Sequence, residues 1–238
     1  DLINGPLFRF TCIQNIVTNS TIFIPNFHHI IIDGTQFDKL MEKISHHYHY
    51  TPNLEEYDQN CVAQLQAYIT WEAEQIKRAD LQYWINKAEN YPLEINLPYK
   101  HLLIDKIKSK ENAALYRLDD ELYDRVQQCS SKLGCSIFDI FKTVWALLIC
   151  QYSNQTKIII TYPINTRRKG FKSVKGAFLN ACLFFFEVRG SFRSCIRDQK
   201  KERRDIHHRY ISIIEILSRL ENAAFKCAIS QADLAISG

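Results

Sequence analysis

Two adjacent histidines and a following aspartate are the residues of this chain whose types and spacing best suit catalysis. They lie in the heptapeptide 28–34, HHIIIDG, directly after the apolar, alternating run 21–27. A neutral imidazole at the end of a buried strand can accept a proton from a nucleophile, and Asp33 can brace the turn. The arrangement indicates acyl-transfer chemistry. The simpler alternative is a strand that runs into a loop, with His28 and His29 partly exposed.

The complete pattern, His-His-x-x-x-Asp-Gly with a helix start at 35–41, resembles the signature of condensation domains of nonribosomal peptide synthetases. It also resembles that of their acyltransferase relatives with the chloramphenicol acetyltransferase fold. Five further segments resemble parts of the same family, in the family's order. They are 1–9, the aromatic stretches 68–71 and 81–84, the Pro-x-x-x-Arg segment 162–167 and the Gly-x-Phe-x-Asn segment 176–180.

The chain departs from the family pattern in two respects. The family's His-x-x-x-Pro-Phe segment would align with 208–213, where the proline and the phenylalanine are missing. The chain also begins in the middle of what should be the first lobe and stops inside the second. We therefore expect a fragment, or a reduced relative, of a larger two-lobed domain.

The resemblance implies an α/β fold of the chloramphenicol acetyltransferase type, in which the active-site motif lies where two αβ sandwich lobes meet. Residues 1–95 would be part of the N-terminal lobe and 113–238 part of the C-terminal lobe. We expect the linker between the lobes at 96–112, because prolines and mixed polar residues break the periodicity from residue 91 onward.

Local patterns predict the elements that carry these segments. Strands are expected at 21–27, 113–118, 157–162 and 183–188, and helices at 35–46, 61–88 (as one helix or two), 119–133 and 137–150. Gly134 should end the third of these helices. Ser136 and Asp139 should form a capping box that begins the fourth.

The chemistry assigned to His29 follows from the resemblance, which gives the second histidine of the pair the role of base or positioning group. Amide formation from a thioester needs an unprotonated amine, and a neutral imidazole can take up the proton that is released. The family pattern turns Asp33 away from the channel toward an arginine, which here is Arg167. A contact between Asp33 and Arg167 would hold the loop that carries His29. Alternatively, Arg167 is a surface residue of the basic run 167–169.

Three further residues complete the predicted site. Gly34 allows close backbone approach and can present its N–H to an oxyanion. His28 is expected to support the site from the strand end and not to act as a ligand. Asn180 either lines the channel or caps a strand, and the sequence does not favour one of these over the other.

Composition narrows the class of protein. With 46% hydrophobic and 24% charged residues, the chain can bury a substantial core. Its eight cysteines include no Cys-x-x-Cys pair and lie mostly among apolar neighbours, which favours reduced thiols and a cytoplasmic location. The apolar segment 137–150 is short and contains Asp139 and Lys142, so no membrane span is predicted.

Other clusters of charged residues and histidines carry weaker signals. The histidines at 46, 47 and 49 and the pair 207–208 lack acidic or thiol partners at metal-site spacing, so no metal site is predicted. The net charge is +4, and the basic cluster 200–204 includes an acid and no aromatic platform. This pattern favours a solvated face over a nucleic-acid site, although an acidic carrier protein could use such a face.

The leading hypothesis is a condensation domain that joins a donor acyl or peptidyl thioester to an acceptor amine. The resemblance implies that donor and acceptor peptidyl carrier proteins present both substrates on 4′-phosphopantetheine, that neighbouring synthetase domains are partners, and that the chain binds no cofactor of its own. No covalent nucleophile motif is present, so direct transfer is favoured. The alternatives are a stand-alone acyltransferase that uses acyl-coenzyme A or a carrier-bound donor, and an inactive module that docks carrier proteins.

Overall fold

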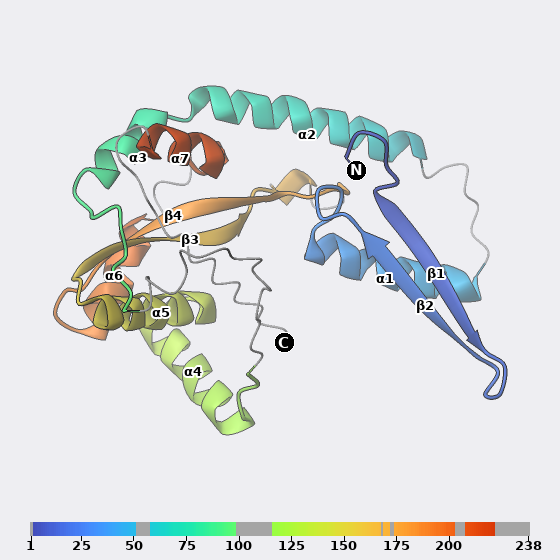
Figure 1. Ribbon diagram of the computed structural model, residues 1–238, viewed down its shortest axis with the longest axis horizontal. Coiled ribbons are helices and arrows are strands. Elements are labelled where there is room, and N and C mark those ends of the chain that lie inside the picture. The colour runs from blue at the N-terminus through green and yellow to red at the C-terminus, as the bar shows by residue number, and fades with distance from the viewer. Residues whose placement is uncertain are drawn as a thin grey trace. The chain divides into compact units, whose positions relative to one another are not determined.

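The chain forms two compact units in a computed structural model that describes residues 2–50, 58–98, 116–167, 169–171, 174–202 and 208–221 (Figure 1). The first unit comprises residues 1–74 and 165–179, and the second comprises residues 75–164 and 180–238. Both contain strands and helices, in agreement with the predicted α/β class.

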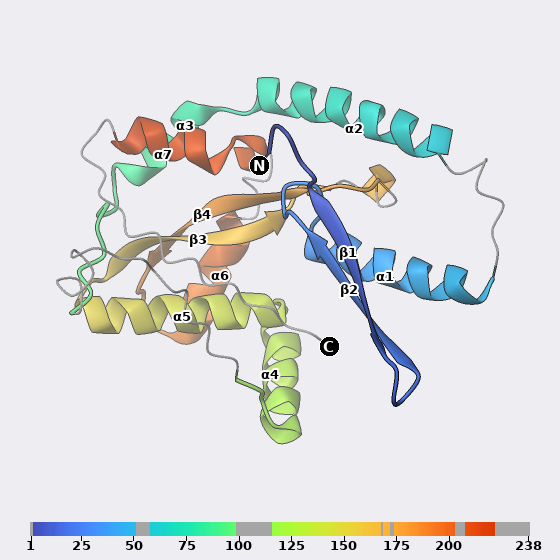
Figure 2. The same ribbon diagram turned by 45° about the vertical axis from the view of Figure 1, so that its right-hand side comes forward.

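An antiparallel hairpin of β1 (Phe8–Asn15) and β2 (Ser20–Phe27) begins the first unit (Figure 2). The side-chain oxygen of Asn15 closes the turn by accepting bonds from the backbone N–H groups two and three residues further on, at 3.0 and 3.2 Å. Strand β2 confirms the strand predicted at 21–27. Strand β1 was not predicted, and its register pairs Phe8 with Phe27.

The hairpin is largely exposed, so the prediction that the histidines follow a buried strand was wrong. One face carries Phe8, Phe10, Phe23 and Phe27, and the other carries Ile13, Ile22 and Ile24 among polar residues. Phe37 of α1 (Gly34–His49) packs on Phe27, with ring centroids 6.1 Å apart. A ribbon of two strands is too narrow to cover its own faces. Both of its strands are edge strands, in which proline is tolerated, and this explains why Pro25 can lie within β2.

The helical pattern predicted over 61–88 is two helices, α2 (Asp58–Arg78) and α3 (Leu81–Ala88). Asp80 begins α3, because its side chain accepts a bond of 2.8 Å from the Gln82 N–H.

The second unit is organised around β3 (Lys157–Asn165) and β4 (Leu179–Glu187), and helices cover both faces of this pair (Figure 1). One face packs on α3 and α7 (Ile213–Glu221), and the other packs on α5 (Ile137–Ser153) and α6 (Phe192–Glu202).

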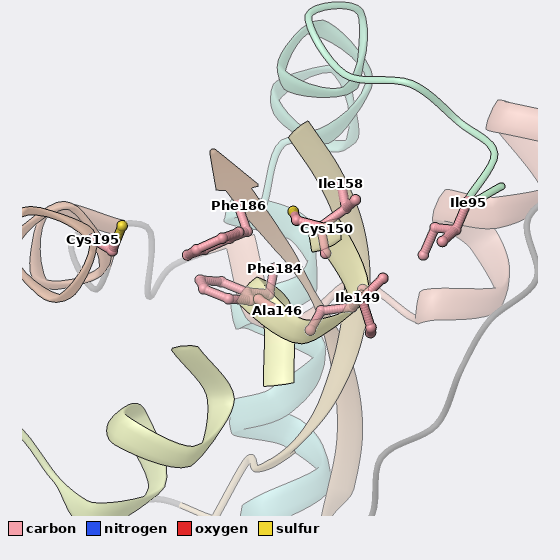
Figure 3. Packing of buried hydrophobic residues seen from close by; sticks show 9 residues of the cluster. Ile95, Ala146, Ile149, Cys150, Ile158, Phe184, Phe186 and Cys195 are labelled. Carbon is pink, nitrogen blue, oxygen red and sulfur yellow. The ribbon is translucent and has the colours of Figure 1, made fainter. Parts of the chain in front are cut away.

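Alternation along the two strands divides their side chains between these two layers. The first core contains Ile159, Leu183 and Phe185 with Trp84, Ala88, Ile211, Ile216 and Leu220. The second contains Ile158, Ile160, Phe184 and Phe186 with Ile95, Ala146, Ile149, Cys150 and Cys195 (Figure 3). Strands that are buried on both faces require continuous apolar runs, and both strands have them.

The predicted helix signals around residue 134 are confirmed. Helix α4 (Asp120–Leu133) ends at Gly134, whose φ of 61° is the left-handed conformation that favours glycine. Ser136 and Asp139 form the capping box that begins α5.

The prediction of a strand at 113–118 was wrong over 116–118. These residues form no helix or strand, and Asp119 then caps α4. Residues 113–115 lie outside the described residues. Within the described chain, no strand pairs with residues 116–118. Among the described helices, none is long and apolar enough to cross a membrane alone, although α4 and α5, bent by 98°, meet that criterion as a pair.

The compact units differ from the predicted lobes 1–95 and 113–238. Residues 75–95 group with the second unit because Trp84 and Ala88 pack in its core, and 165–179 group with the first. The predicted linker, 96–112, lies outside the described residues from position 99 onward. The lobe boundaries stay a prediction.

Candidate active site

The two histidines lie on a turn between β2 and α1. The His28 N–H donates to the Leu7 carbonyl at 2.8 Å and so extends the hairpin by one residue. The Ile31 N–H then donates to the His28 carbonyl at 3.1 Å, which closes the turn. The Ile30 N–H donates to Nδ1 of His28 at 3.2 Å, so the neutral imidazole of His28 carries its proton on Nε2. His28 therefore stabilises the turn on which His29 lies.

The His29 side chain is exposed and forms no hydrogen bond within the described chain. An imidazole that these residues leave unbonded is available to a substrate. Its catalytic role stays a prediction.

Asp33 is the residue that fixes the end of this turn. Its side chain is 2% exposed, and both of its carboxylate oxygens are used. Oδ1 accepts from the Gln36 N–H at 2.9 Å, which makes Asp33 the N-cap of α1. Oδ2 accepts from the Phe178 N–H at 3.1 Å and from Nη2 of Arg167 at 3.3 Å. The predicted contact between Asp33 and Arg167 is thus present.

Arg167 is buried, with its side chain 4% exposed, so the alternative of a surface arginine was wrong. Its Nη2 also donates to the Gly176 carbonyl at 3.3 Å. Its guanidinium lies over the Phe178 ring, 4.3 Å from the centroid. A buried pair with this many bonds is a rigid support for the segment before α1.

A second set of contacts ties the 165–179 segment to α2. The hydroxyl of Tyr68, a residue only 1% exposed, donates to Glu72 at 2.7 Å and lies 3.2 Å from the Thr166 hydroxyl. Thr166 donates to the Phe178 carbonyl through both its N–H and its hydroxyl, at 2.9 and 3.2 Å. The Tyr68 ring packs against Phe178 with centroids 4.5 Å apart. The helical pattern predicts only that Tyr68 belongs to the core, and nothing in the local sequence reveals these partners.

Gly34 is the first residue of α1, and its N–H has no partner in the described chain. N–H groups of the first helical turn lack intrahelical acceptors, so this one can donate to an oxyanion. A Cβ placed on Gly34 would meet no atom within 4 Å. Packing within the chain therefore does not require glycine at this position.

Asn180 connects β4 to a neighbouring segment of the second unit. Its Nδ2 donates to the carbonyls of Arg209 and Ile211, both at 2.8 Å, and its Oδ1 accepts from the Ala181 N–H at 2.9 Å. The amide thus clamps a loop against the strand. The channel-lining alternative stays a prediction.

His208 lies in the segment that lacks the family's proline and phenylalanine, and it is well anchored. Its Nδ1 accepts from the Asp80 N–H at 3.1 Å, and its carbonyl accepts from Nε1 of Trp84 at 3.1 Å. Its ring stacks on Tyr83 with centroids 4.2 Å apart. These contacts are structural, and they hold His208 against α3. Position 207 lies outside the described residues.

Two buried thiols have strongly raised pKa values. Burial raises the pKa of Cys182 to about 12, although Arg209 and Lys142 act in the opposite direction. Burial and the neighbouring Cys195 raise the pKa of Cys150 to about 11. Both thiols stay protonated at neutral pH and are inert core groups, unlike a catalytic cysteine.

The family model for the condensation domain matches residues 1–227. This chain belongs to the condensation domain family. Bacitracin synthase 1 of Bacillus licheniformis is 26% identical over 200 residues, which are 81% of this chain and 4% of that protein. Gramicidin S synthase 2 of Brevibacillus brevis is 22% identical over 183 residues, which are 76% of this chain and 4% of that protein. The chain thus spans a small part of the length of its curated relatives.

Solved condensation domains share its fold. The first condensation domain of the calcium-dependent antibiotic synthetase, in complex with a substrate analogue, has a TM-score of 0.65 at 16% identity, over 94% of this chain and 51% of that one. The condensation domain of the Monacolin K polyketide synthase MokA has a TM-score of 0.65 at 16% identity, over 98% and 54%. The predicted chloramphenicol acetyltransferase-like fold is confirmed by this likeness.

Proposed function

We propose that this condensation domain forms amide bonds in nonribosomal peptide synthesis, joining a donor acyl or peptidyl thioester to the amine of an acceptor aminoacyl thioester. The observation that carries the proposal is the organisation of the 28–34 turn. Asp33 is buried and fully bonded behind the turn, whereas His29 is exposed on it. This is the division of roles that the family motif requires.

In the proposed reaction the acceptor amine attacks the thioester carbonyl, a C–N bond forms, and the C–S bond breaks. His29 accepts the proton that the amine nitrogen loses, or holds the amine in place while it is lost, and the proton ends on the departing thiolate. The N–H of Gly34, which no described residue bonds, donates to the oxyanion of the tetrahedral intermediate. The Asp33–Arg167 pair keeps the turn rigid without touching the substrate.

The proposed partners are donor and acceptor peptidyl carrier proteins, which present the substrates on 4′-phosphopantetheine, together with neighbouring synthetase domains. No cofactor bound by this chain is needed, because proton transfer and positioning suffice for the reaction. The proposed location is the cytoplasm, where the buried thiols stay reduced.

The test is amide formation from a donor carrier and an acceptor carrier, both loaded through phosphopantetheine and incubated with the polypeptide that contains this chain. We expect a peptidyl product on the acceptor carrier, detected by intact-protein mass spectrometry. Turnover of soluble acyl-coenzyme A with a free amine or alcohol, without any carrier, would instead show a stand-alone acyltransferase. Carrier binding without product from any donor would show a docking module.

A further inference from the structure

The ion pair of Asp33 and Arg167 alone does not fix the orientation of the arginine. Among the described residues, the guanidinium donates to Asp33 Oδ2 and to the Gly176 carbonyl, and both bonds, each of 3.3 Å, start from the same nitrogen, Nη2. Its Nε is buried and has no partner there. Arginine and carboxylate orient each other best through two parallel bonds, which this pair does not form. Neighbouring residues must therefore orient Arg167.

Thr166, the residue before Arg167, is buried and bonded twice to Phe178. Its N–H and its hydroxyl both donate to the Phe178 carbonyl, at 2.9 and 3.2 Å. The Phe178 N–H donates to Asp33 Oδ2 at 3.1 Å, and the Phe178 ring centroid lies 4.3 Å from the Arg167 guanidinium. Thr166 thus sets the spacing of the two donors, from Phe178 and from Arg167, that converge on one oxygen of Asp33.

Tyr68 of α2 holds Thr166 in turn. Its hydroxyl lies 3.2 Å from that of Thr166 and donates to the Glu72 carboxylate at 2.7 Å. A chain in which Thr166 donates to Tyr68, and Tyr68 to Glu72, ends on a charge, and each bond in such a chain strengthens the next. The Tyr68 side chain is 1% exposed. It therefore acts on the site only through its neighbours.

We propose that the Tyr68 hydroxyl is a positioning group for the reaction at His29. It acts through Thr166, which sets the donors on Asp33, and Asp33 ends the turn that carries His29. All four residues lie in the first unit. The inference rests on the proposed amide formation, and it adds a hydroxyl of α2, outside the motif, to the groups that determine the rate. Its loss should lower kcat and leave KM unchanged, because the imidazole is displaced while no group that binds substrate is removed.

The first test is amide formation by the polypeptide that contains this chain, with both carriers loaded, at a temperature at which circular dichroism shows every variant to be folded. Tyr68→Phe keeps the ring, and Thr166→Val keeps the shape of the side chain. Each should lower kcat at least about fivefold, with KM for either carrier unchanged within about twofold. Thr166→Ser keeps the hydroxyl and should lower kcat less than about twofold. The double variant Tyr68→Phe with Thr166→Val should be at most about twofold slower than the slower single variant, because both act through one link.

Thr143→Val is the matched control. Thr143 of α5 is fully buried, and its hydroxyl also has two partners, since it donates to the Asp139 carbonyl at 2.6 Å and accepts from Nε2 of Gln199. It lies in the second unit, on a helix that carries no predicted site residue. This variant should also be less stable in urea unfolding than the wild type, yet it should keep the wild-type kcat within about twofold.

Amide hydrogen exchange of the full chain, followed by NMR, tests the positioning without any turnover. The N–H of Ile31 reports on the turn, because its bond to the His28 carbonyl closes the turn around His29. We expect this N–H to exchange at least about fivefold faster in Tyr68→Phe than in Thr143→Val, since only the first variant loosens the turn locally.

Three results would overturn the proposal. One is a smaller loss of kcat in Tyr68→Phe than about fivefold. Another is a Thr166→Ser variant as slow as Thr166→Val. The third is exchange of the Ile31 N–H that is no faster in Tyr68→Phe than in Thr143→Val. A wild-type chain that forms no product would instead refute the proposed amide formation, and the exchange rates would then decide by themselves whether Tyr68 positions the turn.

Discussion

Replacing Arg167 by methionine is expected to destabilise the chain by about 3–5 kcal/mol, which is the cost of leaving one partner of a buried ion pair without the other. Methionine keeps an apolar contact with Phe178, so packing changes little. The Asp33 carboxylate keeps its two backbone N–H donors but loses the guanidinium, and with 2% exposure it cannot be solvated in its place.

Asp33→Ser is the complementary variant. Serine can still accept the Gln36 N–H as the N-cap of α1, whereas Arg167 is left buried and unpaired, so we expect a loss of about 3–5 kcal/mol again. The double variant, Asp33→Ser with Arg167→Met, removes both charges. Its remaining cost is that of the Phe178 N–H and the Gly176 carbonyl, each left without a partner at about 1–3 kcal/mol, and the second of these is already lost in Arg167→Met. The two substitutions should therefore be non-additive by more than about 3 kcal/mol.

The assay is urea unfolding at pH 7, followed by circular dichroism, for the wild type, the two single variants and the double variant. The reasoning would be refuted if each single variant cost less than about 1 kcal/mol, the range of exposed pairs. It would also be refuted if the double variant cost as much as the two single variants together.

Four further predictions concern single residues. Tyr68→Phe keeps the ring contacts but removes both contacts of a buried hydroxyl, and should cost about 1–2 kcal/mol in urea unfolding. Asn180→Ala leaves two carbonyls without their donor and should cost about 2–3 kcal/mol in the same assay. Gly34→Ala should change stability by less than about 1 kcal/mol, since its Cβ meets nothing, and should lower amide formation only if a substrate approaches that backbone. At pH 8, iodoacetamide should alkylate the exposed Cys12 and spare Cys182, whose raised pKa keeps it protonated, as read by peptide mass spectrometry.

The raised pKa of Cys182 also fixes the sign of a pH effect. The folded chain holds this proton up to about pH 12, whereas the unfolded chain releases it near the ordinary value of 9.0. Stability should therefore fall as pH rises above that ordinary value, and Cys182→Ala should reduce this part of the fall in urea midpoints.

Local signals in the sequence were sufficient where a residue acts on its own neighbours. The cap at Gly134, the capping box at Ser136 and the helix after Asp33 depend on bonds within a few residues. The contact of Asp33 with Arg167 joins residues 134 positions apart, and it was predicted only because both match positions of a family motif.

Tertiary contacts without such a motif were not predictable. Tyr68 meets Thr166 across 98 positions, and Asn180 meets the backbone of 209–211 across about 30. The exposure of β2 was also missed, because an alternating apolar strand has the same pattern whether or not another layer covers it.

The most direct test of the central claim is the rate of amide formation by His29→Ala with both carriers loaded. We expect a loss of about 10²–10⁴-fold with unchanged unfolding, because the side chain is exposed and makes no bond within the described chain. His47→Ala, an exposed histidine of α1, is the control and should keep the wild-type rate. A His29→Ala chain that retained the wild-type rate within about threefold would contradict the assignment of the reaction to this histidine.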